Sequence, residues 1–369
     1  MKLFLLRYVG AFASIFSSWS AFSTMVLATF LYAALYPQPY LGEVVRKAPI
    51  VAVDQDGSTS SRALLRRIAN TDGVHIAATV HDMHAAKDLF YKREAYGIVI
   101  IPPQFEQTLL DGHPSPIAAY GDASYFIIYS AIVSAVRDAV STMGTEVQFA
   151  RLTAAGTDAN SATSLISPIN ITSVTLFNPE GGYNSYVVPA AFVLILQQTL
   201  LMGIGILQSG RRNRRGAEML AEPVAYITLY LVLIFFSQEM LPRLYHIPKI
   251  GETHTLFLVA LPFLTATCAL GYVITRLIPW REGILFFLVV LGMPLFFLSG
   301  VSWPFEEIPP VIHALSLLFP STTAITAIVQ VNQMGADYQD VLPTVYTLLG
   351  LTVFYSLLSV GIGALKRRQ

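Results

Sequence analysis

Six long apolar runs constrain this chain of 369 residues more than any other feature. A helix needs about 20 mostly apolar residues to cross the hydrocarbon core of a bilayer. Runs of that length therefore predict a multi-pass, α-helical integral membrane protein. The first run is too long for a secretion signal, so we expect an uncleaved anchor. The predicted spans lie near Phe12–Tyr36, Tyr186–Leu207, Pro223–Met240, Thr255–Thr275, Gly283–Ser299 and Leu342–Leu365.

Charged residues are concentrated in one segment. They make up only 12% of the chain, about half the fraction of a soluble domain. Yet residues 37–183 hold ten of the 23 Lys and Arg and 14 of the 23 Asp and Glu. This segment therefore has the composition of a soluble domain placed between two spans. The formal net charge is zero, which predicts no strong attraction to nucleic acid.

The distribution of cations predicts the orientation, because loops on the cytoplasmic side carry an excess of Lys and Arg. With both termini in the cytoplasm, eleven cations lie inside and two lie in the short outer loops. Residues 37–183 are then extracytoplasmic. The eleven inner cations are Lys2, Arg7, Arg211, Arg212, Arg214, Arg215, Arg276, Arg281, Lys366, Arg367 and Arg368; the outer two are Arg243 and Lys249.

The segment 37–183 alternates between strand and helix patterns. The strands "IVAV", "VHIAATV", "YGIVII" and "SPIAAYG" are each followed by a helical stretch, which predicts a small, mostly parallel α/β sheet. The segment "INITSVTLF" at 169–177 is expected to add a strand. The predicted organisation is an interfacial start and first span at 1–36, the α/β domain at 37–183, and five spans within 184–369.

The last helix of this domain, near 123–155, carries apolar residues at alternating spacings of three and four. Such a seam fits two arrangements: packing on the domain's own sheet, or packing against the same helix of a second subunit. The dimer-seam candidates are Phe126, Tyr129, Val133, Val136, Val140, Met143 and Val147.

Candidate catalytic groups are few. "VAVDQDGST" resembles the Asp-x-Asp-Gly start of haloacid-dehalogenase phosphatases, but the downstream Lys and acidic pair that such an enzyme needs are missing. Asp54 and Asp56 therefore predict a strand-to-helix turn, with Ser58 or Thr59 as a helix cap. The pair His81 and His84 gives too few ligands for a structural zinc site, so we expect no metal. No Gly-Lys pair exists, so the chain lacks a P-loop.

The segment 209–222, between the second and third spans, has four Arg in five residues and then a short amphipathic helix pattern. Pro223 is placed where the next span could begin. A polar helix on the cytoplasmic side is suited to docking a partner. The candidate coupling residues are Arg211, Arg212, Arg214, Arg215, Gly216, Glu218, Leu220, Glu222 and Pro223.

Residues 300–340 form a region too apolar and too long for a plain loop, and it has no Lys or Arg. Prolines divide it into two short helices that we expect to enter the outer leaflet and return. Its Ser and Thr residues could line a polar vestibule or simply pack. The marker residues are Trp303, Pro304, Pro309, Pro320 and Thr322.

Several motifs together resemble the type-2 ATP-binding-cassette (ABC) exporter permeases that have a large domain between their first two spans. "VAVDQDGSTSSRALLRRI", "YGIVIIPPQF" and "NPEGGYNSYVVP" are similar to stretches of that group, and "RRGAEMLAEPV" and the proline-rich run from 298 to 336 are the most specific matches. Ala217 and Glu222 stand where the family usually has Thr.

The resemblance implies a permease subunit of an ATP-driven exporter for a hydrophobic or amphipathic substrate. It implies a cytoplasmic ABC ATPase that holds ATP and Mg²⁺, so this chain would bind no cofactor itself. A second permease copy or a sister permease, and a periplasmic adaptor, are further implied partners in a bacterial inner membrane. An alternative from the residues alone is a membrane-anchored receptor whose external domain binds a ligand.

Overall fold

The computed structural model describes residues 2–42, 44–169, 174, 176–178, 182–209, 218–303 and 305–366. The chain divides into two compact units, one formed by Met1–Glu43 with Thr175–Gln369 and one formed by Val44–Val174. The expected strand at 169–177 falls largely outside the described residues.

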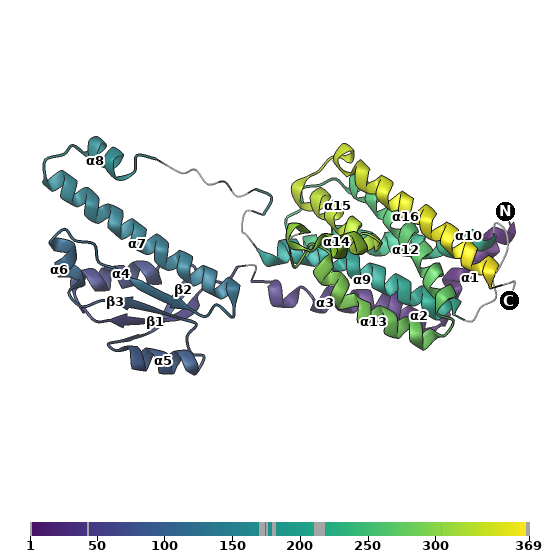
Figure 1. Cartoon of the computed structure of the whole chain (residues 1–369), viewed down its shortest axis with the longest axis horizontal. Helices are drawn as coiled ribbons and strands as arrows, with labels where there is room; N and C mark the ends of the chain where they lie inside the picture. The colour runs from purple at the N-terminus through teal and green to yellow at the C-terminus, as the bar shows by residue number, and fades with distance from the viewer. Residues whose placement is uncertain are drawn as a thin grey trace. The chain divides into compact units, whose positions relative to one another are not determined.

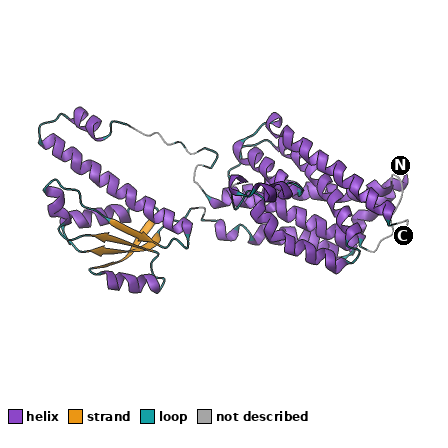
Figure 2. Cartoon of the chain, in the orientation of Figure 1, coloured by secondary structure: helices purple, strands orange, loops and turns teal. Residues whose placement is uncertain are grey.

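The unit Val44–Val174 is built on a four-stranded sheet in the order β2-β1-β3-β4. Strand β1 is parallel to β2 and β3, and β4 is antiparallel to β3. The central strand β1 is buried along nearly its whole length, as expected for a parallel strand covered on both faces. The mostly parallel sheet predicted from the sequence is thus present (Figure 2). The strands are β1 Ala48–Asp54, β2 Val74–Val80, β3 Gly97–Ile101 and β4 Ala118–Gly121.

Helices cover the two faces of this sheet. Helices α4 and α7 pack in one core with Ile50, Ala52 and Val99, whereas α5 packs on the opposite face against Val51 and Val53 (Figure 1). The alternation of side chains along β1 explains why both faces are apolar. The helices of the unit are α4 Thr59–Ala69, α5 Met83–Tyr91, α6 Phe105–Leu110, α7 Phe126–Ala154 and α8 Ala159–Ile166.

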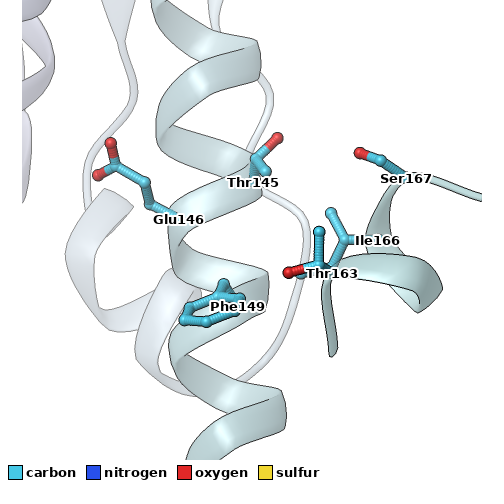
Figure 3. A pocket seen from close by; sticks show the side chains of 6 residues that line it. All are labelled: Thr145, Glu146, Phe149, Thr163, Ile166 and Ser167. Atoms are coloured by element: carbon cyan, nitrogen blue, oxygen red, sulfur yellow. The ribbon is translucent and has the colours of Figure 1, made fainter. Parts of the chain in front are cut away.

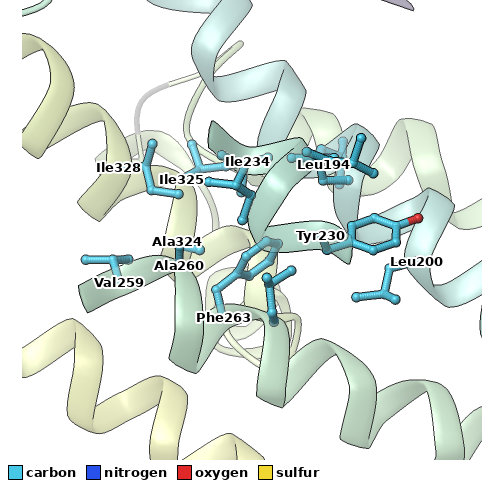
Figure 4. Packing of buried hydrophobic residues seen from close by; sticks show 14 of the residues in the cluster. Leu194, Leu200, Tyr230, Ile234, Val259, Ala260, Phe263, Ala324, Ile325 and Ile328 are labelled. Atoms are coloured by element: carbon cyan, nitrogen blue, oxygen red, sulfur yellow. The ribbon is translucent and has the colours of Figure 1, made fainter. Parts of the chain in front are cut away.

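The other described unit is helical. Helices α9 and α12 lie at its centre, where 78% and 67% of their apolar windows are buried, against 17% for α13 and 22% for α16. Tyr230, Phe263 and Ile328 belong to the main core cluster, drawn in Figure 4. Its helices are α1 Lys2–Ser17, α2 Trp19–Phe22, η1 Ser23–Leu27, α3 Ala28–Leu35, η2 Gln38–Tyr40, α9 Tyr183–Gln208, α10 Glu218–Phe235, η3 Phe236–Met240, α11 Leu241–Leu244, α12 Thr253–Leu277, α13 Arg281–Leu298, η4 Phe305–Glu307, α14 Pro310–Ser316, α15 Pro320–Met334 and α16 Tyr338–Leu365.

Seven described helices are long and apolar enough to cross a membrane, and the bent pair α14 and α15 would make an eighth. Six of the seven overlap the six predicted spans. The seventh is α7, whose residues Ile132, Ala135, Val136 and Ala139 are buried in the core of the α/β unit. Length and composition alone therefore do not separate this helix from the spans.

The start of the first span is corrected by the structure. A continuous span from Phe12 was predicted, but the spanning helix runs from Trp19 to Tyr40 and α1 is a separate helix. The break is at Ser18, whose backbone is extended and whose hydroxyl accepts a hydrogen bond from the N–H of Ala21. A Ser in that conformation caps a new helix rather than continuing the old one.

Candidate functional site

An amide side chain links the end of α9 to the start of α10. Nε2 of Gln208, the last residue of α9, donates to Oε2 of Glu222 at 2.6 Å and to the Tyr226 hydroxyl at 3.0 Å. Both partners lie near the start of α10, and Tyr226 is fully buried. A movement of Glu222 would therefore act directly on the end of α9.

Two further bonds close the same end of the helical unit. The Ser209 hydroxyl donates to the carbonyl of Pro279 at 3.0 Å, between α12 and α13. The Lys366 ammonium donates to the carbonyl of Arg276 at the end of α12.

Leu220, near the start of α10, leaves 62% of its surface exposed. An apolar side chain next to a half-buried carboxylate is a suitable contact for a docked protein.

The predicted coupling residues are only partly placed. Arg211, Arg212, Arg214, Arg215 and Gly216 lie outside the described residues. Glu218, Leu220, Glu222 and Pro223 fall in the first turns of α10.

The predicted separate helix before the third span is wrong. Helix α10 runs without a break from Glu218 to Phe235, with Pro223 inside it. Proline loses no hydrogen bond in the first turn of a helix, where the N–H groups lack intrahelical partners. One turn later it removes one hydrogen bond and its ring crowds the carbonyl four residues earlier, yet α10 continues through Pro223. Force applied at Glu222 therefore acts on the spanning helix itself.

The seam residues on α7 do not share one environment. Val136 is buried, and Val140 and Met143 pack against the sheet core. Val133 and Val147 are half-buried, whereas Phe126 is 75% exposed. The ring of Tyr129 lies against Gly121, where an added Cβ would come within 2.8 Å of it. Packing on the domain's own sheet thus accounts for the middle of the seam.

The region 300–340 contains two helices at an angle of 88°, where they were predicted. Pro309 caps α14 and Pro320 is the first residue of α15. Trp303 is exposed, Thr322 is buried, and Pro304 lies outside the described residues. The Tyr186 hydroxyl of α9 donates to the carbonyls of Gly300 and Val301 at 3.0 and 2.6 Å, which anchors the start of the region.

The buried amide of Gln197 bonds α9 to the start of α15. Oε1 of Gln197 accepts from the backbone N–H of Ser321 at 2.7 Å, and its Nε2 donates to the Ser321 hydroxyl at 2.9 Å. Both residues are fully buried. The N–H of Ser321 lies in the first turn of α15 and has no intrahelical partner. A span residue thus supplies the cap, and Ser321 lies in packing rather than in an open vestibule.

A second buried polar layer was not predicted. Gln238 of η3 donates to the carbonyl of Pro189 at 2.9 Å and accepts from Nδ2 of Asn332 at 2.8 Å. Glu239 is 2% exposed and pairs with Lys249. These residues connect η3 with α9, α15 and the chain before α12. A single Glu at the end of an apolar run gives little sequence signal.

The "DQDGST" turn is occupied by structural hydrogen bonds. Asp54 accepts from the N–H groups of Asp56 and Gly57 and from the Ser61 hydroxyl. Asp56 accepts from two N–H groups at the start of α6, at 3.0 and 3.2 Å. Glu106 of α6 in turn accepts from the N–H and hydroxyl of Ser60. The starts of α4 and α6 are therefore capped by each other's flanking carboxylates, so these acids have a structural role in the turn.

The histidine pair is not gathered with other ligands. His81 contacts the carbonyl of Asp54 through Nδ1 at 3.1 Å, and His84 lies 3.6 Å from Asp88 on an exposed helix face. Across the described ranges, no group of three or more His, Cys, Asp or Glu could hold a metal ion.

A small open cavity of about 230 Å³ lies between α7 and α8 (Figure 3). Binding pockets for drug-sized ligands usually measure about 300–1,000 Å³. Its one charged lining residue, Glu146, already pairs with Arg67. The lining residues are Thr145, Glu146, Phe149, Thr163, Ile166 and Ser167.

These features define a class: a multi-pass membrane protein with a buried polar framework and a second unit built on a small α/β sheet. A family model described as ABC-2 family transporter protein matches residues 15–360. The chain therefore belongs to the ABC-2 transporter family, and it is a membrane transport subunit whose ATPase activity resides on a separate cytoplasmic ABC subunit. A search of curated proteins finds no match.

Proposed function

We propose that this chain is the permease subunit of an ATP-driven exporter that moves a hydrophobic or amphipathic substrate out of the cytoplasm or inner membrane. The family match over residues 15–360 carries the transport part of this proposal. The scarcity of charge within the spans supports a substrate other than an ion, because charges at membrane depth are costly and usually functional.

The proposed topology has both termini in the cytoplasm of a bacterial cell, six spans, and an extracytoplasmic domain at 37–183. The excess of Lys and Arg on one side supports the orientation. The position of α7 in the core of the α/β unit supports counting it with that domain rather than as a span. The working unit is two permease chains, identical or sister, with two ATPases, and a periplasmic adaptor is a further proposed partner.

The proposed coupling site is the start of α10. The ATPases bind around Glu218, Leu220 and Glu222, and their closure moves α10. Gln208 then carries the movement to α9, because its amide bonds Glu222 and Tyr226 at once. The partner ATPase need only bind two permease states with different affinity. ATP and Mg²⁺ remain on the partner, and this chain catalyses no reaction.

Charge reversal tests the coupling site. The double variant Glu218→Lys/Glu222→Lys should lose substrate-stimulated ATPase activity and co-purification of the ATPase in a reconstituted complex. Glu282→Lys is the control, since Glu282 is an exposed acid at the start of α13 and predicted to lie on the same membrane side. Wild-type stimulation in the double variant would remove the case for this docking site.

The receptor alternative makes a different prediction. A receptor would not co-purify with an ABC ATPase, and its external domain would need a ligand pocket. Among the described residues, the cavity between α7 and α8 is smaller than such pockets usually are, so this cavity gives the receptor no support.

A further inference from the structure

The α/β unit exposes large apolar and aromatic side chains at one edge of its sheet. We define the leading edge as the edge where β1 and β3 begin and β4 ends, since Ile50 pairs with Gly97 and Gly97 pairs with Gly121. Each side chain in this group is about half exposed or more, which is unusual for a cluster on a soluble surface. The group consists of Tyr91, Tyr120, Tyr125, Phe126 and Ile127.

Backbone and side-chain bonds hold this group together. The N–H of Tyr96 donates to the carbonyl of Pro49, and the N–H of Asp122 donates to the carbonyl of Tyr96. The Arg93 guanidinium pairs with Asp122 at 2.6 Å and lies over the ring of Tyr125 at 5.6 Å. The end of α5, the end of β4 and the start of α7 therefore meet at this edge.

The charges of the two edges differ. The leading edge has the cations Arg46, Lys47, Lys92 and Arg93 beside the acids Asp72, Glu94 and Asp122. At the opposite edge, where β1 and β3 end, the acids Asp54, Asp56, Glu106 and Asp111 predominate. A mixed aromatic and cationic surface suits anionic headgroups, and an acidic one does not.

The chain itself limits how far the leading edge can lie from a bilayer. The first spanning helix ends at Tyr40 and β1 begins at Ala48. The seven residues between them reach at most about 25 Å when fully extended. The far end of β1 is another seven residues along, or about 23 Å further. The start of β1, at the leading edge, can therefore lie no farther than about 25 Å from the end of this candidate span, which is within reach of the headgroup layer.

We propose that the leading edge is a membrane-contact surface. Tyr91, Tyr125 and Phe126 enter the headgroup layer, as aromatic residues do at both interfaces of membrane proteins. Lys47 and Lys92 contact anionic lipid headgroups. Lipid, rather than a second copy of the chain, covers this apolar surface. This proposal goes beyond the exporter assignment and does not depend on it.

Spin-label depth measurements on the full chain in nanodiscs with anionic lipid test the proposal. A label at Phe126→Cys is compared with one at Leu110→Cys, in a Cys268→Ala background. Phe126 and Leu110 are each 75% exposed but lie at opposite edges of the unit. The label at 126 should be accessible to oxygen and protected from a water-soluble nickel reagent. The label at 110 should show the reverse.

Equal accessibility of both labels to the nickel reagent would overturn the proposal. Strong spin–spin broadening at position 126 would also overturn it, because it would place a second copy on this surface. Nanodiscs made of zwitterionic lipid test the contribution of the cations to membrane contact. They should reduce the depth of the label at 126 and leave the label at 110 unchanged, and an equal depth at 126 in both lipids would exclude an attraction of this surface to net negative headgroups.

Discussion

The bonds between Gln197 and Ser321 offer the sharpest test of how α15 is fixed against α9. Gln197→Leu keeps the side-chain size and removes both hydrogen bonds. The N–H of Ser321 is then buried without its only cap, which costs about 1–3 kcal/mol for a buried unsatisfied group. The lost bond from Nε2 to the Ser321 hydroxyl adds about 0.6 kcal/mol, the average for side-chain hydrogen bonds between membrane helices. We expect a total loss of roughly 1.6–3.6 kcal/mol.

Two variants make this prediction specific. Ser321→Ala leaves the Ser321 N–H paired with Oε1 of Gln197 and leaves only Nε2 of that amide without a partner. It should therefore cost less than Gln197→Leu, which leaves both the N–H and the hydroxyl of Ser321 without Gln197. Gln198→Leu is the matched control, because both amide atoms of Gln198 are buried without a partner in the described part of the chain. Its removal should be neutral or stabilising, since a buried unpaired amide is costly.

The measurement is the free energy of unfolding of the purified chain in bicelles, by denaturant titration. The three variants and the Gln197→Leu/Ser321→Ala double variant complete a double-mutant cycle. A loss for Gln197→Leu no larger than that for Ser321→Ala would refute the argument that a span residue caps α15. Equal losses for Gln197→Leu and Gln198→Leu would refute it as well.

Three further predictions follow from buried polar and apolar contacts. Asp56→Ala should expose α6 to hydrogen exchange with a loss of about 1–2 kcal/mol, because it removes a cap; unchanged exchange would count against the cap. Lys249→Met should reduce the stability by less than the about 3–5 kcal/mol of a fully unpaired buried charge, because it leaves Glu239 buried with only the Arg243 guanidinium, 3.7 Å away. Glu239→Gln should cost less still; a reversed order in thermal melts would contradict this. Val136→Asp should unfold the α/β unit, because Val136 is buried in its core. Val147→Asp should leave the unit resistant to protease and should dissociate any dimer that forms through α7. A Val147→Asp variant that stays dimeric would place the seam inside one subunit.

The sequence predicted the helical class, the sheet and most element bounds because each depends on local periodicity. The strand β1 and the Ser58 cap lie where the "IVAVDQDGST" stretch places them. The first span was misplaced because hydropathy alone gives no signal at Ser18, where a cap rather than polarity ends the helix. Pro223 misled for a related reason, since a proline near a helix start is compatible with either a boundary or a continuing helix.

The contacts that carry the site could not be predicted, because each one joins residues far apart in the sequence. Gln197 and Ser321 are 124 positions apart, and Gln238 and Asn332 are 94 apart. A single Gln in an apolar run has no visible partner until the helices are packed. The α7 seam was visible in the sequence as a periodic pattern, but a periodic pattern does not show which surface buries those residues.

Helix α9 connects these contacts along one rigid element. At its start, the carbonyl of Ser185 accepts from Gln333, and near its end Gln208 bonds α10. Between them, Pro189 and Gln197 bond η3 and α15. A shift of α10 at Glu222 must therefore either move α9 or break the Gln208 bonds, and a moved α9 displaces α15 because buried groups cannot be left unpaired without cost. Gln208→Leu should accordingly uncouple the two ends while leaving the Gln197 cap intact, and hydrogen exchange at the start of α15 that still responds to the ATPase in that variant would show that α9 is not the connecting element.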